Sequence, residues 1–451
     1  MLSNYKKIYM IGIGGISMSA IAEYLSYKNY EVSGSDRVSS QITQRLQNKN
    51  IKVYIWHDEN NIDTSIDLVV YTAAIHDDNV ELAKAKKLGI KLVTRAKLLG
   101  MIMENYKYSI AIAGSHGKTS VTAMISEILI KAGKDPTIFI GGILPSINEN
   151  FRMGDSQYFI MEACEYCDSF LNFHPYVGVI NNIDLDHMDY FKDLKQIETS
   201  FLKFAQNIKN DGLLVINDNY ANAVELYNGR KLTFGSQNSN WYATDVIYNE
   251  NQCVEFTAVN KEVKISKIKL KIPGYHNVLN ALTAICVAYE LGIDESDIKN
   301  GLENFHGAQR RFEFKGIYKG AKIIDDYAHH PNELKETIAT AKKIPHNNLW
   351  FVFQPHTYTR TKIFFDDFIK VLSQIDNLIL VDIYAAREKN IYGINSSDLA
   401  DAINKLGNNV IYCKSFDEAE SYLKNKIADG DLVLTVGAGD VYKIGEYLLK
   451  N

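Results

Sequence analysis

The sequence predicts an α/β protein of parallel sheets covered by helices, because short β-rich apolar runs alternate with amphipathic helical stretches throughout the chain. Two glycine-rich loops each follow an apolar run and precede a helical stretch, which is the arrangement of a nucleotide-binding βα unit. At roughly 100 to 200 residues per domain, the 451 residues predict three domains.

The composition narrows the class of protein further. The 54 acidic and 49 basic residues give a net charge of −5, and the basic residues are scattered, so we expect no nucleic-acid partner. Five cysteines are too few, and odd in number, for a disulfide framework, which favours a reducing compartment, the cytoplasm. The first apolar run breaks into glycines and no run approaches the roughly 18 residues of a membrane span, so neither a signal peptide nor membrane insertion is expected.

The first domain is expected over residues 1–106 as a Rossmann-like unit. Apolar runs predict strands, and stretches with helical periodicity predict helices. The strands are expected at 6–12, 30–33 and 67–72, and the helices at 16–28 and 95–104.

The central domain is expected over 107–312 and the C-terminal domain over 313–451. In the central domain a strand at 108–113 restarts the βα alternation, and a helix at 277–291 resumes it. Between them, residues 241–272 alternate apolar and polar side chains, which predicts a small antiparallel insertion. The third alternation predicts a Rossmann-like domain with strands at 321–324, 349–353, 378–381 and 432–436.

The first glycine-rich loop, Gly12-Ile13-Gly14-Gly15-Ile16-Ser17, follows a predicted strand and opens a predicted helix. Such glycines let backbone N–H groups approach a pyrophosphate at the helix N-terminus. Asp36 follows the next strand, where a ribose-binding acid belongs. Ser17 replaces the third glycine of the dinucleotide fingerprint, so a nucleotide diphosphate is only slightly favoured over NAD, and a merely tight turn is also compatible with the pattern.

The second loop, Gly114-Ser115-His116-Gly117-Lys118-Thr119-Ser120, has the flanking strand and helix of a P-loop and gives a much stronger signal. In such a loop Lys118 neutralises the β- and γ-phosphates, and the Thr119 hydroxyl can ligate Mg²⁺. Glu162 and His187 each follow an apolar strand and could ligate metal, although Mg²⁺ prefers oxygen to a histidine nitrogen.

Two polar clusters follow strands of the third domain. The first is Asp325-Asp326-Tyr327-Ala328-His329-His330-Pro331, and the second is Gln354-Pro355-His356-Thr357-Tyr358-Thr359-Arg360. Two such clusters at neighbouring strand ends predict a polar pocket suited to a carboxylate and an amine.

Taken together, these motifs resemble those of the Mur ligases of peptidoglycan synthesis, and the match covers the whole chain. The run Pro273-Gly274-Tyr275-His276-Asn277-Val278-Leu279-Asn280 and Arg310-Arg311-Phe312 belong to the same resemblance. Within the family, Phe353-to-His356 and Asp382-to-Glu388 are similar to the motifs of the branch that adds L-alanine.

The resemblance implies roles for these residues. The first loop would bind the diphosphate of a UDP-sugar through Gly12, Gly14, Gly15, Ile16, Ser17, Met18, Ser19 and Asp36. ATP would be bound by Gly114, Ser115, His116, Gly117, Lys118, Thr119, Ser120, Asn277 and Asn280, and Mg²⁺ by Thr119, Glu162 and His187. Lys118, Arg311 and Asp326 would be catalytic, and the amino acid would meet Tyr327, His329, His330, His356 and Arg360.

The implied reaction is ligation of L-alanine to the lactyl carboxylate of UDP-N-acetylmuramate. The carboxylate would attack the γ-phosphorus of ATP to give an acyl phosphate, and the amine would then displace phosphate. Thr357 stands where many relatives carry Arg, and Lys203 is the nearest candidate for the carbamylated lysine of sister ligases. The alternatives are a Mur-type ligase that adds a tripeptide and, in a different class, an NAD-dependent oxidoreductase.

Overall fold

The computed structural model describes residues 2–72, 75–188, 190–386 and 388–450, and it confirms the α/β class. The chain forms two compact units. The first contains Met1–Ile183, Lys195–Phe234 and Cys286–Asp294, and the second contains Asp184–Leu194, Gly235–Ile285 and Glu295–Asn451. Arg387, within the predicted motif Asp382-to-Glu388, lies outside the described residues.

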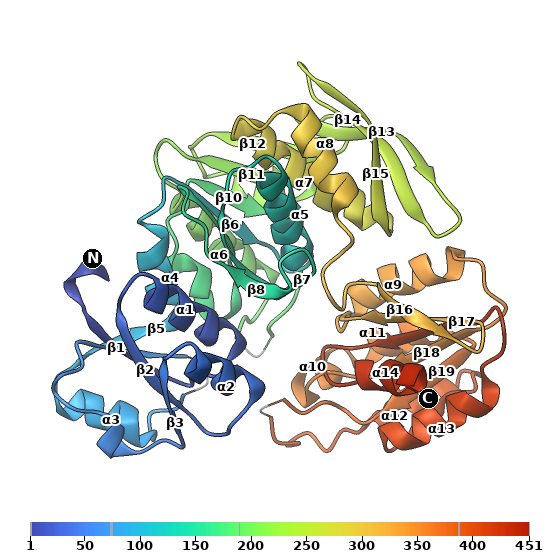
Figure 1. Ribbon diagram of the computed structural model, residues 1–451. Coiled ribbons are helices and arrows are strands. Elements are labelled where there is room, and N and C mark those ends of the chain that lie inside the picture. Colours follow the sequence, from blue (N-terminus) through green and yellow to red (C-terminus); the bar gives the residue numbers. More distant parts are fainter. Residues whose placement is uncertain (1, 73–74, 189, 387, 451) are drawn as a thin grey trace. The chain divides into compact units, whose positions relative to one another are not determined.

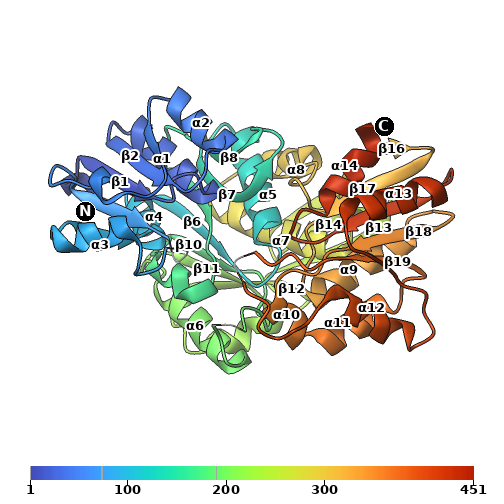
Figure 2. The same cartoon turned by 90° about the horizontal axis from the view of Figure 1, so that it is seen from below.

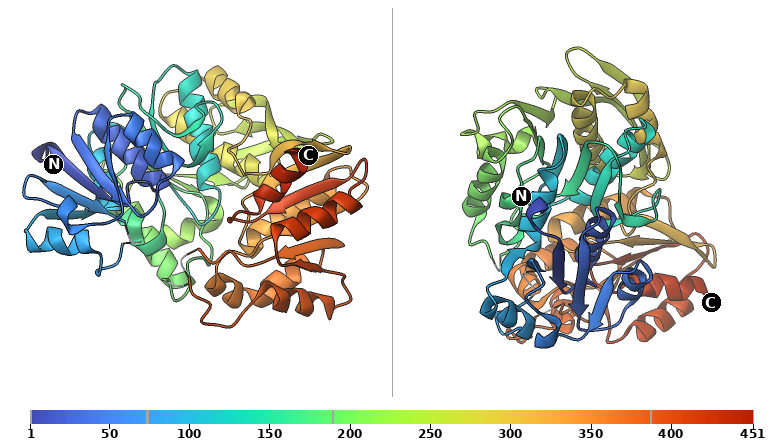
Figure 3. Two further views of the ribbon diagram at one scale, coloured as in Figure 1. Left: turned by 60° about the horizontal axis from the view of Figure 1, so that its bottom comes forward. Right: turned by 60° about the vertical axis from the view of Figure 1, so that its left-hand side comes forward.

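The N-terminal sheet of the first unit, drawn in blue in Figure 3, is parallel. Its strand order is β3-β2-β1-β4-β5. Tyr9 and Ile11 pack against Leu82 of α3, and Ile8 and Met10 are equally buried on the other face, so both faces of the central strand are covered. The strands are β1 (Lys7–Ile11), β2 (Glu31–Asp36), β3 (Lys52–Ile55), β4 (Leu68–Tyr71) and β5 (Lys91–Thr94). The helices are η1 (Leu2–Asn4), α1 (Ile16–Tyr27), α2 (Gln41–Asn48), η2 (Glu59–Asn61), α3 (Val80–Lys87) and α4 (Arg95–Met103).

A second set of strands in the first unit has the order β12-β11-β10-β6-β9-β7-β8, in which β8 runs antiparallel to β7. Strand β6 lies between β10 and β9, so the loop that follows it leaves from the middle of the sheet. The strands are β6 (Tyr108–Ala113), β7 (Thr137–Leu144), β8 (Glu149–Arg152), β9 (Tyr158–Glu162), β10 (Val177–Ile180), β11 (Leu213–Asn217) and β12 (Lys231–Gly235). The helices are α5 (Lys118–Lys131), η3 (Tyr166–Asn172), α6 (Leu194–Gln206) and η4 (Asp218–Val224).

The predicted antiparallel insertion is confirmed in the second unit (Figure 1). Strand β14 (Cys253–Val259) pairs antiparallel with both β13 (Trp241–Tyr248) and β15 (Lys264–Pro273). Helix α7 (Tyr275–Glu290) follows, and its last residues belong to the first unit; α8 (Glu295–Asn304) comes next.

The C-terminal sheet has the order β16-β17-β21-β18-β19-β20, with only the edge strand β16 antiparallel among its described pairs. Phe351 and Phe353 pack with the core of α9, α11 and α12, whereas Val352 packs with that of α13 and α14, so the sheet lies between two helical layers (Figure 2). The strands are β16 (Glu313–Tyr318), β17 (Ala321–Asp326), β18 (Leu349–Phe353), β19 (Asn377–Val381), β20 (Ile411–Cys413) and β21 (Leu432–Val436). The helices are α9 (Pro331–Lys343), α10 (Tyr358–Ile363), α11 (Phe365–Leu372), α12 (Ser396–Asn404), α13 (Phe416–Lys426) and α14 (Tyr442–Lys450).

Within the described part of the chain, no helix has both the length and the apolar character that a bilayer crossing requires.

Gly100 allows an unusually close approach inside the first unit. A Cβ built on this residue of α4 would lie 2.2 Å from the carbonyl oxygen of Asn172 at the end of η3. Backbone at this contact cannot rotate away as a flexible side chain can. The glycine therefore sets how closely α4 packs on η3.

We expect Gly100→Ala to lower the melting temperature, although alanine is the better helix former by roughly 0.5–1 kcal/mol. The overlap with the Asn172 carbonyl outweighs that gain, because overpacking a tight contact typically costs about 1–3 kcal/mol. Thermal unfolding measures the effect, and Lys97→Ala on the exposed side of the same helix is the control. A Gly100→Ala protein that melts higher than wild type would show that the two elements separate without cost.

Candidate active site

The first glycine-rich loop is held in place by the end of β2. Gly12 has a φ of 78°, and its N–H and that of Ile13 both donate to the Ser35 carbonyl oxygen. The Gly14 N–H donates to Asp36 Oδ2 at 2.8 Å, and a Cβ on Gly14 would lie 2.8 Å from that same oxygen. A side chain at position 14 would therefore disrupt the loop.

Helix α1 begins at this loop with an N-terminus suited to an anion. Its N-cap residue, Gly15, has no side chain that could accept the first N–H groups of the helix. Two residues that sequence reasoning did not identify lie beside it. The Arg95 guanidinium donates to Ser17 Oγ at 2.8 Å, and the Asn150 amide donates to the Ile16 carbonyl oxygen at 3.2 Å.

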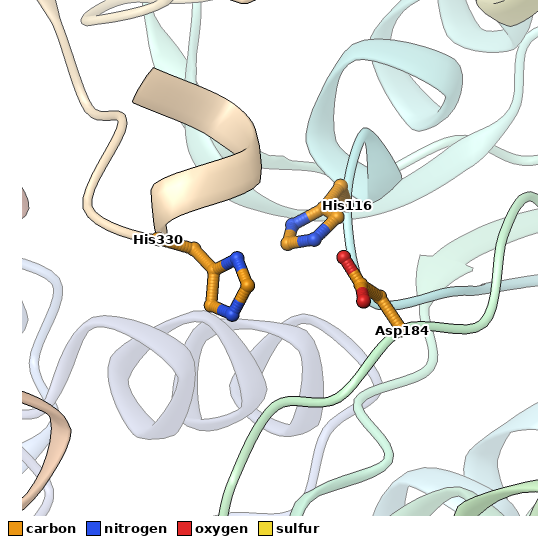
Figure 4. Close-up of side chains that lie close together, drawn as sticks. All are labelled: His116, Asp184 and His330. Carbon is orange, nitrogen blue, oxygen red and sulfur yellow. The ribbon is translucent and has the colours of Figure 1, made fainter. Parts of the chain in front are cut away.

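The second loop has the backbone geometry of a phosphate cradle. Gly114 and Gly117 have φ values of 141° and 79°, which glycine adopts without strain. The amide group of Asn182 accepts the His116 N–H at 2.7 Å and donates to the His116 carbonyl oxygen at 2.9 Å. Figure 4 shows His116 in this loop, ahead of α5.

Lys118 points back over the loop that it ends. Its ammonium group donates to the carbonyl oxygens of Gly114 and Ser115 and forms an ion pair of 3.0 Å with Glu165. Glu165 is almost fully buried, so the pair is only slightly exposed to water. Sequence reasoning did not identify Glu165, which lies 47 residues further along the chain.

Two oxygen-bearing side chains lie against neighbouring glycines of β7. The Glu162 carboxylate accepts the Gly141 N–H at 2.7 Å. A Cβ on Gly142 would lie 3.2 Å from the Thr119 methyl group. The structure thus brings Glu162 and Thr119 to one short stretch of β7, and both carry the oxygen ligands that Mg²⁺ prefers. His187, which has a φ of 55°, belongs to the second unit.

In the second unit, Arg360 is the centre of a polar cluster at the start of α10. Its guanidinium pairs with Asp186 at 2.9 Å and lies 3.2 Å from His356 Nδ1. Thr357 forms the N-cap of α10 at a φ of 65°, and its hydroxyl accepts the Arg360 N–H. Burial alone would raise the pKa of Asp186, but the Arg360 guanidinium and neighbouring histidines hold it well below its ordinary value.

Two neighbouring imidazoles complete this cluster. The rings of His329 and His356 are edge to face, 5.6 Å apart, and His329 Nδ1 lies 3.3 Å from a Glu333 carboxylate oxygen. Desolvation lowers the pKa of His329 to about 3 and that of His356 to about 4. Both are therefore neutral at pH 7, so each ring has an unprotonated nitrogen that can accept a hydrogen bond.

His330 differs from its neighbour because its ring is used inside the fold. It is the N-cap of α9, where Nδ1 accepts the Asn332 N–H at 3.3 Å, and Nε2 lies 3.0 Å from the Leu185 carbonyl oxygen (Figure 4 shows the residue at the helix start). These bonds occupy both ring nitrogens and account for the buried side chain without a substrate.

The predicted catalytic pair Arg311 and Asp326 lies beside Tyr327. The guanidinium groups of Arg310 and Arg311 each lie 5.0 Å from the Tyr327 ring. Asp326 accepts the Ala328 N–H and the Thr337 hydroxyl, and burial raises its pKa to about 6.

The remaining predicted residues differ in exposure. Asn277 and Asn280 are buried, and their amides form a chain in which Asn280 donates to Asn277 and Asn277 donates to the Pro273 carbonyl oxygen. Lys203 is exposed on α6.

Models of one protein family match three consecutive stretches of the chain. Residues 7–107 match the model described as the Mur ligase family, catalytic domain; residues 112–288 match the Mur ligase middle domain; and residues 310–439 match the Mur ligase, glutamate ligase domain. The chain belongs to the Mur ligase family.

Among Mur ligases, the chain is 51% identical over 447 residues to the UDP-N-acetylmuramate–L-alanine ligase of Agathobacter rectalis, covering 98% of this chain and 97% of the relative. It is 48% identical to the enzyme of the same name from Acetivibrio thermocellus, covering 100% and 97%. The crystal structure of the UDP-N-acetylmuramate–alanine ligase of Thermotoga maritima superposes with a TM-score of 0.83 at 28% identity, covering 98% of each chain. A murein peptide ligase from Psychrobacter arcticus, 23% identical with a TM-score of 0.71 over 99% and 98% of the two chains, shares the fold.

The lowered pKa values of His329 and His356 predict acid sensitivity of the second unit. Between about pH 6.5 and pH 4 these two histidines become protonated in the unfolded chain but stay neutral in the folded protein. The free energy of unfolding therefore falls as the pH falls through this range. We expect the melting temperature to drop below pH 6.5 and to drop less steeply in His356→Asn. The exposed His174→Asn is the control. A His356→Asn protein with the wild-type pH dependence would contradict the assignment.

Proposed function

We propose that this chain is an ATP-dependent ligase that joins L-alanine to the lactyl carboxylate of UDP-N-acetylmuramate and releases ADP and phosphate in peptidoglycan precursor synthesis. The observation that carries the proposal is the end-to-end match to ligases of that name, at 51% identity over 447 residues. The two loops described above supply the two nucleotide sites that such a reaction needs. An NAD-dependent oxidoreductase would have no use for the second loop.

We assign three domains, 1–106 for the UDP-sugar, 107–312 for ATP and 313–451 for the amino acid. The first loop is proposed to bind the UDP-sugar diphosphate at the start of α1, supported by the glycine N-cap and the tight Gly14 contact. The Arg95 guanidinium, which is bonded to Ser17, adds positive charge beside this loop. Five cysteines are an odd number and too few for a disulfide framework, so the enzyme is proposed to act in the cytoplasm.

The second loop fits the triphosphate of ATP. The positive φ values at Gly114 and Gly117 leave room for phosphate oxygens against the backbone, and Lys118 already lies over the loop. Bound phosphate would replace the loop carbonyl oxygens and Glu165 as partners of the Lys118 ammonium group. The oxygen atoms of Thr119 and Glu162 are proposed to hold Mg²⁺, which would offset the negative charge of the phosphates, with His187 as a further contact.

The reaction needs both an activated carboxyl group and a neutral amine. The lactyl oxygen attacks the γ-phosphorus, the bond to the ADP oxygen breaks, and the carboxyl group becomes an acyl phosphate. The alanine nitrogen then attacks the carbonyl carbon, phosphate leaves, and the amine proton must be accepted. Lys118 offsets the repulsion between the two anions in the first step, and Arg311 is proposed to assist.

The polar cluster around Arg360 is proposed to bind alanine. A substrate carboxylate would compete with Asp186 for the guanidinium, whose planar fork suits bidentate pairing. The imidazoles of His329 and His356, neutral at pH 7, are proposed to face the amine, with Tyr327 beside them. A small cavity beside Arg360, lined in part by Asp186 and Thr357, is proposed to accept alanine and to exclude the tripeptide of the alternative ligase on steric grounds.

Lys118→Ala is expected to reduce the rate of ADP formation at least about 1000-fold without loss of folded structure, because a fixed cation at the transferred phosphate contributes several kcal/mol to the transition state. ADP release with UDP-N-acetylmuramate and L-alanine measures the rate. Lys131→Ala, exposed at the end of the same helix, is the matched control. Near-normal turnover by the Lys118 variant would refute the ATP site.

Arg360→Ala is expected to raise the KM for L-alanine about 10- to 100-fold, since a charge-assisted hydrogen bond contributes about 1.5–3 kcal/mol. The KM values for ATP and UDP-N-acetylmuramate should change little. Arg360→Lys should recover only part of the loss, and the exposed Lys362→Ala in the same helix is the control. Equal loss of affinity for all three substrates, or faster ligation of a tripeptide than of alanine by the wild type, would refute the assignment.

A further inference from the structure

Trp56 has a backbone conformation that folding alone does not explain. It follows β3 directly and has a φ of 85°, a region that bulky residues adopt only under constraint. Its side chain is 65% exposed, whereas Trp241 and Trp350, the other tryptophans of the chain, are 1% and 8% exposed. The protein therefore keeps a strained backbone conformation at a residue whose indole adds little to stability through burial.

Contacts on both sides of Trp56 hold this conformation. The Trp56 N–H donates to the Asp36 carbonyl oxygen at 2.7 Å. The next residue, His57, has its Nδ1 atom 2.8 Å from Ser35 Oγ and 3.1 Å from the fully buried carboxylate of Glu81. Glu81 also accepts the Tyr9 hydroxyl at 2.8 Å. This network, which the proposed chemistry does not use, fixes the segment that presents the indole.

The same contacts place Trp56 beside the first glycine-rich loop. Asp36 accepts the Trp56 N–H through its carbonyl oxygen and the Gly14 N–H through its side chain at 2.8 Å. In the β2–β3 register Asp36 lies opposite Ile55, so Trp56 is one residue beyond the carboxyl end of the neighbouring strand. Ligands of open parallel sheets bind at this edge.

We propose that the exposed indole of Trp56 is the stacking surface for the pyrimidine base of the nucleotide whose diphosphate binds at the Gly12–Gly15 loop. This inference rests on the proposed function, in which that loop holds a UDP-sugar. The indole is flat and its ring face is apolar, so stacking on a base would bury apolar surface that is now exposed. This gain would offset the cost of the strained backbone. Trp56 would contact the base through its ring face and not through hydrogen bonds. This contact would therefore raise the affinity for the nucleotide without selecting one base over another.

The position of the tryptophans makes the test direct, because Trp56 is the one that water can reach. Binding of UDP or UDP-N-acetylmuramate to the wild type is expected to quench its tryptophan fluorescence, and binding of inorganic pyrophosphate is not. Trp56→Phe should lose the quenching and keep most of the affinity, measured by calorimetry. Equal quenching by pyrophosphate, or quenching that persists in Trp56→Phe, would overturn the proposal.

Trp56→Gly separates binding from folding. Glycine adopts a φ of 85° freely, so the variant should melt close to the wild-type temperature. Its dissociation constant for UDP should rise roughly tenfold, the effect expected for loss of one base–aromatic stack. Tyr27→Ala removes an exposed aromatic ring from the far end of α1 and should leave UDP binding unchanged.

The outcomes distinguish this inference from the function on which it rests. If the wild type binds UDP-N-acetylmuramate by calorimetry, but Trp56→Gly binds UDP equally well, stacking is refuted and the ligase proposal stands. If the wild type binds no UDP-sugar, both are refuted. If Trp56→Gly melts well below the wild type, the residue has a structural role, and the quenching and affinity of Trp56→Phe then decide whether it also stacks on the base.

Discussion

The proposed function of this ligase depends on backbone N–H groups at the carboxyl ends of parallel strands, which must stay accessible if phosphate is to bind there. Glycine adopts the positive φ values at Gly12, Gly114 and Gly117 without strain, and the lack of a side chain at Gly14 lets the backbone approach Asp36. Polar groups at or just beyond the ends of neighbouring strands hold both loops. The Ser35 carbonyl oxygen and the Asp36 side chain accept N–H groups of the first loop, and the Asn182 side chain accepts an N–H group of the second. Hydrogen bonds within the protein thus hold both loops, which would reduce the conformational entropy lost on nucleotide binding.

The cationic side chain of each of the two proposed sites forms an ion pair within the protein. Lys118 is bound to Glu165 and Arg360 to Asp186, and in both pairs the acidic partner is the more buried residue. An unpaired charge in such surroundings would be costly, so each acid stabilises its cation within the fold. Under the proposed function, an anionic substrate would compete with these acids for the two cations.

Much of the fold could be predicted from the chain because its central parallel strands are mostly apolar. The predicted bounds of β6, β18 and β21 agree with the structure, since each is an apolar run between polar residues, and alternation identified the antiparallel insertion. The partners of the site residues could not be found in this way. Asp186 and Arg360 are separated by 174 residues, and no local pattern in a sequence indicates which distant acid will meet which base.

His330 and Trp56 also show what cannot be predicted from the sequence alone. A histidine pair after a strand suggests a substrate site, which stays a prediction for both residues. In the structure one of them, His330, also caps α9, and the other, His329, lies beside Arg360 and His356. An isolated tryptophan after a short strand suggests nothing until its backbone angle and exposure are known. In both cases the residue type determines which contacts are possible. The local backbone conformation and its hydrogen bonds determine whether the side chain packs within the fold or is exposed where a ligand could contact it.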